Sequence, residues 1–321
     1  MTPGIGLATL VAAAVAVDLA VGDPRRIPHP VVLMGRLIGA LEARLNRGAA
    51  RARRLGGLAT VLITVVGTFV ATWLACRGLE TTHPWLGLAA ELWLVSTAIA
   101  IKGLGDAGRA VAAPLANGDL PAARTALGRV VGRDTQALDE AGIARGAVET
   151  VAENTSDGIV APLLFALLGG APLALAYKAV NTLDSMIGYR TPRHEHFGRA
   201  AARLDDAVNW LPARMTALCL CLGHRGAWQG ACADAPKHAS PNAGWPEAAV
   251  AYRLGVALGG ASSYQGVVSQ GATLGKPRET PGPDHVRRAI ALMHAAWGRC
   301  FALAAGVTVA AAWLMKTGGV G

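Results

Sequence analysis

Acidic side chains gather just before a long apolar run in the middle of this chain. Arg145, Glu149 and Glu153 recur every four residues, so a helix would present all three on one face, with Asp157 near its end. Proteins hold Mg²⁺ with one or two carboxylates together with phosphate oxygens of a substrate. The spacing therefore predicts a metal site formed by Glu149, Glu153 and Asp157. A structural alternative is that Arg145 offsets one acid while the others face water.

A second polar cluster follows the apolar run directly. On one helix Lys178, Asn181 and Ser185 fall within reach of one face, and Asp184 lies at its margin. Ionisable groups at a membrane boundary commonly serve a function. The alternative is that Lys178 only extends to lipid headgroups.

The third cluster contains two adjacent aspartates. A helix would place Asp205 and Asn209 on one face with Asp206 beside them. The two acids would favour the N-terminal dipole of a helix, or they would supply further carboxylates for Mg²⁺. We therefore add Asp205 and Asp206 to the predicted metal ligands.

Two proline-containing loops complete the polar inventory. The first, GDPRRIPHPVVLMG, carries Asp23 and His29 around two arginines, and a rigid basic loop suits an anionic group. The second, SPNAG, has turn residues that include Asn242 and precedes a helix predicted to begin at Glu247. The phosphate-binding motif GxxxxGK[ST], the GxSxG elbow and the HExxH zinc motif are absent from the sequence.

The composition predicts a helical membrane protein. Of the 321 residues, 52% are hydrophobic, only 16% are charged, and the mean hydropathy is +0.37. Aromatic residues make up 5% while glycine alone contributes 40 residues, which favours closely packed helices over an aromatic-girdled β-barrel. We expect an all-α, polytopic integral membrane protein with cytoplasmic helical and loop segments, forming a single domain over residues 1–321.

Hydropathy places the membrane segments along the chain. Apolar runs predict spans at about residues 5–21, 56–76, 86–101 and 289–315. Runs 159–177 and 208–222 are ambiguous, since Gly169, Gly170 and Pro172 interrupt the first, and we interpret them as uncertain or re-entrant.

The distribution of charge predicts an orientation. The net charge is +9, and the loop from Gly22 to Leu55 carries eight arginines against two acids. Positive loops favour the cytoplasm, so we place this loop and 178–206 inside and the N-terminus outside. Basic residues are not interleaved with aromatic ones, which argues against nucleic-acid binding. The five cysteines mostly lie in or beside apolar runs and are interpreted as small buried hydrophobic residues.

Four long blocks of sequence resemble one known family. GDPRRIPHPVVLMGRLI, VVGRDTQALDEAGIARGAVETVAENTSDGIVAPLLFALLGGAPLALAYKAVNTLDSMIGYR, FGRAAARLDDAVNWLPAR and SPNAGWPEAAVAYRLGVALGG resemble the CobD/CbiB family of cobalamin biosynthesis, in order, from Asp18 to about Gly260. The resemblance implies an adenosylcobinamide-phosphate synthase of the bacterial inner membrane with a cytoplasmic active site. Such an enzyme joins adenosylcobyric acid to an aminopropanol phosphate as an amide, with ATP and Mg²⁺.

Under this resemblance the polar residues receive provisional roles. The catalytic side chains would be Lys178, Asn181, Asp184 and Arg190. Substrate and phosphate binding would fall to Asp23, His29, Arg133, Asn154, Asn209 and Asn242. The carboxylates of the three clusters would hold Mg²⁺ and accept the amine proton.

Two departures from the family pattern concern the choice of amine. Residues Ala261 to Gly275 replace a Tyr-rich turn, and His194 stands where the family usually has an aromatic residue. Ethanolamine phosphate or free aminopropanol thus remain alternative substrates. A membrane transporter of a corrinoid or small polar substrate is the alternative from another class. The expected partners are the corrinoid and amine substrates, membrane lipid, and either later corrinoid-pathway enzymes or a second copy of the chain.

Overall fold

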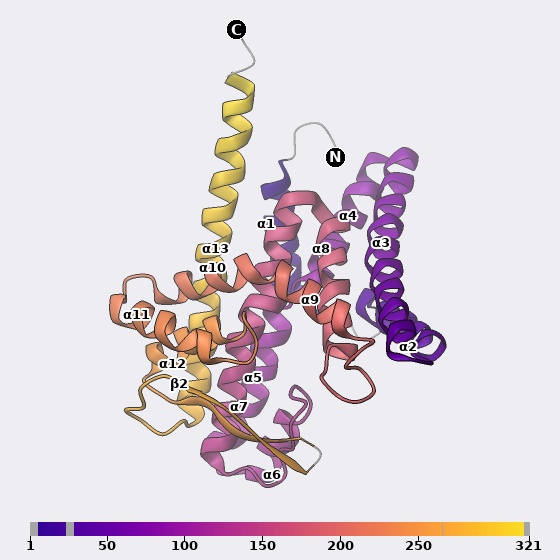
Figure 1. Cartoon of the computed structure of the whole chain (residues 1–321). Helices are drawn as coiled ribbons and strands as arrows, with labels where there is room; N and C mark the ends of the chain where they lie inside the picture. Colours follow the sequence, from indigo (N-terminus) through magenta and orange to yellow (C-terminus); the bar gives the residue numbers. More distant parts are fainter. Residues whose placement is uncertain (1–5, 24–28, 265, 318–321) are drawn as a thin grey trace. The chain divides into compact units, whose positions relative to one another are not determined.

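The computed structural model describes residues 6–23, 29–264 and 266–317 (Figure 1). Helices dominate these residues, as the composition predicts. In chain order the elements are α1 (Leu7–Val21), α2 (Pro30–Leu45), α3 (Ala50–Thr82), α4 (Pro84–Ala98), α5 (Ile101–Ala116), α6 (Leu120–Leu127), α7 (Glu140–Asn154), a π-helix (Thr155–Val160), α8 (Ala161–Ile187), α9 (Arg199–Val208), α10 (Trp210–Cys221), α11 (Arg225–Asp234), a 3₁₀ turn (Ala235–Lys237), α12 (Gly244–Leu254), β1 (Leu258–Tyr264), β2 (Val267–Leu274) and α13 (Pro283–Thr317).

The chain divides into two compact units that interleave along the sequence. Unit 1 comprises the described residues of Met1–Ala100, Ala161–Val208 and Leu303–Gly321. Unit 2 comprises Ile101–Val160 and Asn209–Ala302. Each unit therefore collects segments that are distant in sequence, and the polar clusters fall into different units.

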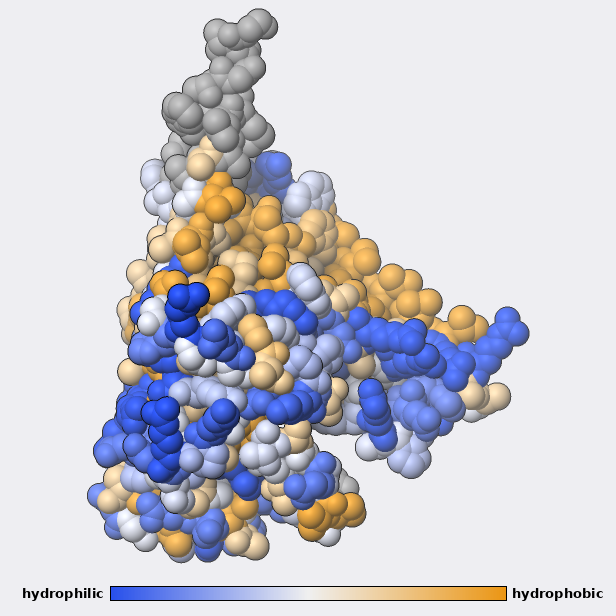
Figure 2. Space-filling model, turned by 60° about the vertical axis from the view of Figure 1, so that its left-hand side comes forward, coloured by the Kyte–Doolittle hydropathy of each residue, from blue (hydrophilic) through white to orange (hydrophobic). Residues whose placement is uncertain are grey.

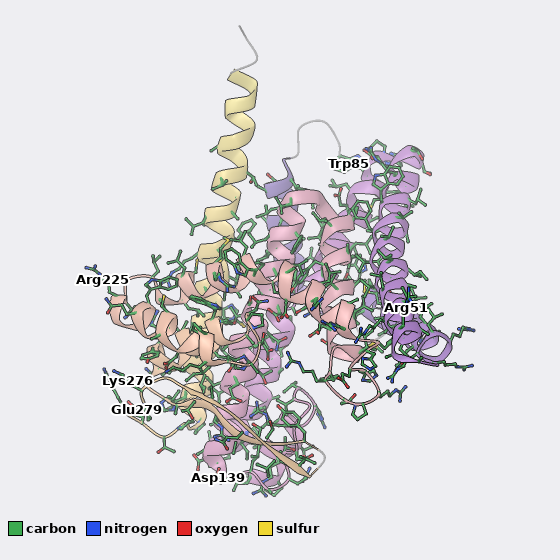
Figure 3. All side chains as sticks on the ribbon, in the orientation of Figure 1. Arg51, Trp85, Asp139, Arg225, Lys276 and Glu279 are labelled. Carbon is green, nitrogen blue, oxygen red and sulfur yellow. The ribbon has the colours of Figure 1, made fainter. Side chains whose placement is uncertain are left out.

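Among the described residues, four helical stretches are long and apolar enough to cross a membrane. They are Ala50–Thr82, Pro84–Ala116, Glu140–Ile187 and Pro283–Thr308. At 1.5 Å per residue the 33 residues of α3 extend about 50 Å, well beyond the thickness of a hydrocarbon core. Large apolar side chains on α3 are exposed, including Leu62, Val66 and Trp73, as expected of a helix that faces lipid. Figure 3 labels Arg51, in the first turn of α3, and Trp85, in the first turn of α4 just after α3 ends.

The shorter apolar runs form shorter helices. Helix α1 has 15 residues and α10 has 12, about 22 Å and 18 Å long, so neither spans a hydrocarbon core of about 30 Å without tilt or help from neighbours. On the face drawn in Figure 2, apolar and hydrophilic side chains gather in separate areas. Separate areas of this kind are typical of a protein that meets both lipid and water.

Helix α8 is broken in its middle. Gly169 has φ −157° and Gly170 has φ +63°, and Figure 1 draws α8 as two arms, 161–168 and 171–187, joined by a sharp turn. A left-handed residue at the turn requires glycine because a side chain there would be strained. In addition, Pro172 at the start of the second arm lacks a backbone N–H. This arch fits the re-entrant interpretation of 159–177.

The core of unit 1 lies where α2, α3, α8 and α9 meet. Ile38, Val61, Leu183, Ile187 and Phe197 are all buried there. A Cβ on residue 57 would overlap the carbonyl of Phe197, so only glycine lets α3 approach the segment before α9. This close approach fixes the loop 188–198 against the beginning of α3.

Unit 2 contains a small antiparallel sheet that the all-α expectation did not include. β1 pairs with β2 from Leu258↔Leu274 to Tyr264↔Val267, with an irregularity between Gly259 and Ala261. Asp134 holds the turn between β1 and β2 in place. Ser263 Oγ and the Gly266 N–H donate to Asp134 Oδ2 at 2.6 and 2.8 Å. A glycine-rich hairpin is hard to predict from sequence because glycine has a low propensity for strands. The contacts with the loop that contains Asp134 stabilise the hairpin in the folded protein.

Candidate functional site

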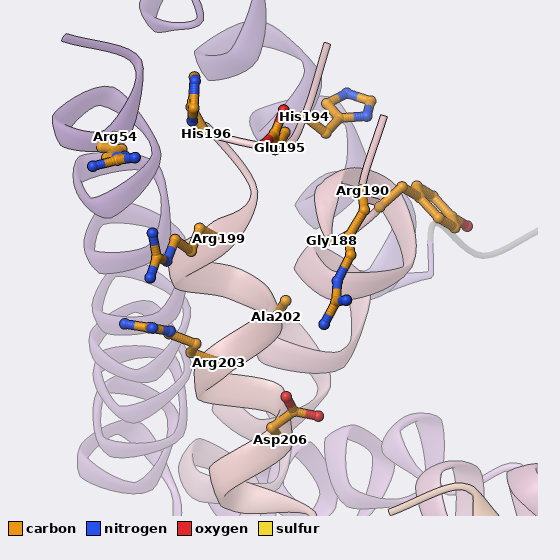
Figure 4. Close-up of a pocket in the computed structure, with 11 residues that line it drawn as sticks. Arg54, Gly188, Arg190, His194, Glu195, His196, Arg199, Ala202, Arg203 and Asp206 are labelled. Atoms are coloured by element: carbon orange, nitrogen blue, oxygen red, sulfur yellow. The ribbon is translucent and has the colours of Figure 1, made fainter. Parts of the chain in front are cut away.

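A basic cavity opens at one end of unit 1 (Figure 4). Its volume is about 420 Å³. Charged and polar lining residues come from α3, from the loop between α8 and α9, and from α9: Arg54, Arg190, Arg199 and Arg203, with His194, His196, Glu195 and Asp206. Four guanidinium groups around one small space give it the chemistry that suits a multiply charged anion, because guanidinium matches phosphate and carboxylate geometry.

The cavity wall is built by hydrogen bonds from α2 and α3. Arg193 Nε donates to Glu42 Oε1 at 2.7 Å, and His194 Nε2 lies 2.9 Å from the same oxygen. Burial by itself would raise the pKa of Glu42, but the hydrogen bonds from His194 and Arg193 outweigh it and lower the pKa. Arg53 adds a donor to the Pro192 carbonyl at 3.0 Å. These contacts hold the loop 190–196 in place.

Two aspartates, Asp184 and Asp206, lie near each other beside this cavity. Asp206 lines the cavity, and Asp184 on α8 is near enough for the two charges to interact. Burial raises the pKa of Asp206, and Arg190 offsets only part of that rise. A side chain at Gly188 would collide with Asp184 Oδ1, so glycine is needed where α8 ends. The predicted catalytic residues Asp184 and Arg190 therefore lie in this region.

Unit 2 contains a buried ion pair that organises its polar interior. Arg133, in the loop before α7, donates to Glu149 Oε2, and their side chains are 14% and 7% exposed. The Gly259 N–H donates to Glu149 Oε1 at 2.6 Å, and Arg133 Nη1 lies 3.4 Å from Ser262 Oγ. Burial lowers the pKa of Arg133, but Glu149 raises it by more, so the guanidinium remains charged.

This arrangement argues against the alternative in which Arg145 offsets one of the acids. Arg145 shares α7 with Glu149, yet its Nη2 donates to the Ala261 carbonyl of β1 at 3.1 Å. The cation that pairs with Glu149 is Arg133, which is 16 residues away in sequence. A pattern search along one helix detects only neighbours on that helix and so misses a partner from a loop.

Glu247 on α12 is a buried acid of unit 2 with a strongly raised pKa. It is 6% exposed, and burial raises its pKa well above the ordinary range. Glu153 and Glu149 raise that pKa further, whereas Arg133 lowers it. Its protonated form is thus favoured, and acids with strongly shifted pKa values are common at functional sites.

A π-helix separates Glu153 from the apolar run. Thr155–Val160 forms this widened turn, which includes Asp157. Thr155 Oγ1 donates to the Val151 carbonyl at 2.6 Å, and buried Ser156 Oγ has no hydrogen-bond partner among the described residues. Single π-turns inside helices occur frequently at functional sites.

A second cavity of about 370 Å³ lies beside β1 in unit 2. Arg133, Arg145, Asp134 and Ser262 are among its lining residues. The predicted phosphate-binding residue Arg133 therefore faces both a buried acid and an open space.

The predicted metal ligands separate into two groups. Glu149, Glu153 and Asp157 belong to unit 2, whereas Asp205 and Asp206 belong to unit 1. Among residues 6–23, 29–264 and 266–317, no group of three or more His, Cys, Asp or Glu side chains is arranged to hold a metal ion.

Asp205 and Asn209 do not share a helix, contrary to the sequence pattern. Helix α9 ends at Val208, and Asn209 is the residue before α10. Asn209 is fully buried and begins the second segment of unit 2. The i+4 spacing predicted a shared face only on the assumption that the helix continued.

Other predicted binding residues mostly have structural contacts. His29 caps α2, since its Nδ1 accepts from the Val31 N–H at 3.2 Å, and its Nε2 lies 3.2 Å from Asp23 Oδ1. The two arginines between them lie outside the described residues. Asn154 Nδ2 donates to the Thr150 carbonyl at 3.0 Å, and Asn242 Oδ1 accepts from Arg214 at 3.2 Å.

Lys178 and Asn181 are half-buried on the second arm of α8, and Ser185 on the same arm is exposed. Ser185 Oγ donates to the Asn181 carbonyl at 2.8 Å. Helix α12 begins at Gly244, three residues before the predicted start. Cys219, Cys221 and Cys300 are buried as expected, whereas Cys232 is exposed.

Sequence reasoning missed several residues of both sites. Arg54, Arg199 and Arg203 line the basic cavity, but in the sequence they indicated only topology. The spacing of Arg199 and Arg203, one helical turn apart, is a detectable signal. Glu247 carried no local signal, because its environment comes from α7.

Comparison with known proteins gives a consistent result. The family described as CobD/Cbib protein matches residues 11–293. A protein of Geobacter metallireducens, named cobalamin biosynthesis protein CobD, is 48% identical over 294 residues, covering 89% of this chain and 92% of the relative. CobD of Klebsiella pneumoniae is 44% identical, covering 93% of this chain and 97% of the relative. CbiB of Salmonella typhimurium is 41% identical, covering 86% and 89%. No solved structure matches the chain.

Proposed function

This chain belongs to the CobD/CbiB family of cobalamin biosynthesis proteins, and on that premise we propose that it is an adenosylcobinamide-phosphate synthase. The reaction joins the propionate carboxyl of adenosylcobyric acid to the amine of an aminopropanol phosphate as an amide. The observation that carries the proposal is the family match, which extends over residues 11–293.

Features of both units support such a ligation. An anionic amine substrate needs cationic side chains, and unit 1 offers four arginines around a small cavity. Removal of a proton from an amine needs an acceptor, and Asp206 lines that cavity. Lys178 and Asn181 on α8 would neutralise and orient groups of the activated carboxyl.

Two of the carboxylates in unit 2 suit a magnesium ion, whereas a third does not. Glu153 and Asp157 lie near enough to Glu247 to raise its pKa, and two carboxylates with phosphate oxygens satisfy Mg²⁺. When bound, ATP with Mg²⁺ would supply the free energy for activating the carboxyl. Glu149 is the least suited ligand, because Arg133 and the Gly259 N–H already engage both of its oxygens.

Charge also supports a cytoplasmic active site in a bacterial inner membrane. Arg54 at the beginning of α3 and Arg190 after α8 line the same cavity, so both lie at one end of unit 1. Arginine-rich ends of spanning helices favour the cytoplasmic side. The arch in α8 explains how the basic segment 178–206 would avoid export.

The test is an assay of purified protein in detergent with adenosylcobyric acid, ATP and Mg²⁺. Aminopropanol phosphate, ethanolamine phosphate or free aminopropanol is added in parallel, and mass spectrometry identifies the corrinoid product. We expect an amide that carries phosphate, with ADP or AMP reporting how the carboxyl is activated. If folded protein forms no amide with any amine and consumes no ATP, the ligase assignment is wrong, and uptake into vesicles becomes the next measurement.

A further inference from the structure

The basic cavity of unit 1 combines an excess of positive charge with a carboxylate at one side. Four arginines and two carboxylates, Glu195 and Asp206, line it, which leaves an excess of two positive charges with the histidines neutral. Asp206 follows Arg203 by three residues on α9, so the acid lies one turn beyond the arginine, on the side of the cavity away from Glu195 (Figure 4). A ligand in this cavity would therefore contact both arginines and the Asp206 carboxylate.

We propose that this cavity binds a small zwitterion, with a phosphate monoester held by the arginines and an ammonium group held by Asp206. The inference rests on the proposed function, in which such a molecule is the amine substrate. It assigns that substrate to residues 188–206 and the beginning of α3.

Size and charge both restrict the ligand. A cavity of about 420 Å³ lies at the low end of the range for small-molecule sites and is far too small for a corrinoid. A phosphate dianion would balance the excess of two positive charges, and Arg199 and Arg203 are placed one turn apart to hold it from one helix. Free aminopropanol lacks the dianion and would leave this excess uncompensated.

The position of Asp206 supports a cationic group at its side of the cavity. Asp206 lines the cavity and is half-buried, so its carboxylate lies where a small ligand would contact it. An ammonium group beside it would form a charge-assisted hydrogen bond.

Two sources could supply a phosphate beside an ammonium: a soluble amino alcohol phosphate, which is a monoester dianion, and the headgroup of phosphatidylethanolamine, which is a diester with a single negative charge. Binding of (R)-1-aminopropan-2-yl phosphate to the full chain in lipid-free detergent is measured by calorimetry, and then repeated in nanodiscs of phosphatidylglycerol with and without phosphatidylethanolamine. Binding that persists in all of these supports the soluble monoester. Binding abolished only by phosphatidylethanolamine shows that the diester headgroup occupies the cavity and overturns the monoester assignment. Absence of binding in both detergent and phosphatidylglycerol overturns the site.

Two truncated probes separate the halves of the cavity. Isopropyl phosphate lacks the ammonium and 1-aminopropan-2-ol lacks the phosphate, and each should bind at least about tenfold more weakly than the zwitterion. Asp206→Asn should weaken the zwitterion about tenfold or more but leave isopropyl phosphate unchanged. Arg203→Gln should weaken both phosphates about tenfold or more.

The matched control pair lies on α3. Arg54 lines the cavity and Arg51, one turn earlier, does not, so Arg54→Gln should weaken phosphate binding whereas Arg51→Gln should not. Equal losses from both, or equal effects of Asp206→Asn on zwitterion and isopropyl phosphate, would overturn the proposal.

The activity assay separates this inference from the ligase assignment. If wild-type protein binds the zwitterion as described but forms no amide, only the proposed function fails. If wild-type protein forms the amide, but neither Arg203→Gln nor Asp206→Asn changes the KM for the amine phosphate, only the cavity assignment fails.

Discussion

The basic cavity of unit 1 and the ion pair of unit 2 use arginine in opposite ways. Arg133 is 14% exposed in its side chain and is matched by Glu149, which also accepts from the Gly259 N–H. Arg199 and Arg203 are exposed and stand one turn apart with like charge. The buried arginine is matched by an acid, whereas the exposed arginines repel one another, a cost that we propose a bound anion offsets. The buried pair and the exposed cluster should therefore respond differently to the loss of an arginine.

Breaking the buried pair should have the largest effect on stability. Arg133→Met leaves the Glu149 carboxylate buried without its cation, which typically costs about 3–5 kcal/mol. Thermal unfolding in detergent should show a large drop in Tm. Arg129→Met, an exposed arginine of the same loop region, is the control and should change Tm little. Adding Glu149→Leu to Arg133→Met should restore part of the loss, and a double variant less stable than the single one would contradict this account.

Adding a side chain at Gly57 should have the second-largest effect on stability. A Cβ there would overlap the Phe197 carbonyl, so Gly57→Ala should cost about 1–3 kcal/mol and weaken ligand binding in the basic cavity by moving loop 188–198. Gly67→Ala on the same helix has open space around its Cβ and should be neutral or stabilising by up to about 1 kcal/mol. Similar Tm values for the two variants would show that α3 does not depend on this close approach.

The pH dependence of stability should reveal the ionisation of Glu247. Its pKa in the folded protein is raised above the ordinary 4.5, first by burial and then by Glu153 and Glu149. Its stabilising contribution is therefore complete below pH 4.5 and is lost as pH rises through the folded pKa. Glu247→Gln stays neutral, so its Tm should rise relative to wild type as pH increases above about 5.

The exposed acid Glu140 provides the control for this measurement. Glu140→Gln should leave the pH profile of Tm close to that of wild type. If the Tm difference between Glu247→Gln and wild type is constant from pH 5 to 8, Glu247 does not titrate in this range.

Removing one cavity arginine should have the smallest effect on stability. Arg203→Gln relieves repulsion from Arg199 four residues earlier, so we expect stabilisation by a few tenths of a kcal/mol in the absence of ligand. High salt should erase the gain, because these charges are exposed and screened. A loss of more than about 1 kcal/mol would place Arg203 with Arg133 among the structural arginines.

The spacing of residues along the sequence predicted some of the local structure in both units. The spacing of Glu149 and Glu153 predicted one helix, and both lie on α7. The interruption at Gly169 and Gly170 predicted a broken segment, and α8 turns there. The same reasoning failed for Asn209, since α9 ends one residue earlier, and for Arg145, whose partner is a backbone carbonyl on β1.

The sequence by itself determined the helical membrane class, the positions of the long apolar helices and the family, because hydropathy and long matched blocks are properties of consecutive residues. Tertiary structure alone decided that Arg133 pairs with Glu149, that Glu247 is buried beside other acids, and that Arg54 joins Arg199 and Arg203 around one cavity. These side chains come from segments far apart along the chain. Their pKa values and binding chemistry depend on distances that only folding sets.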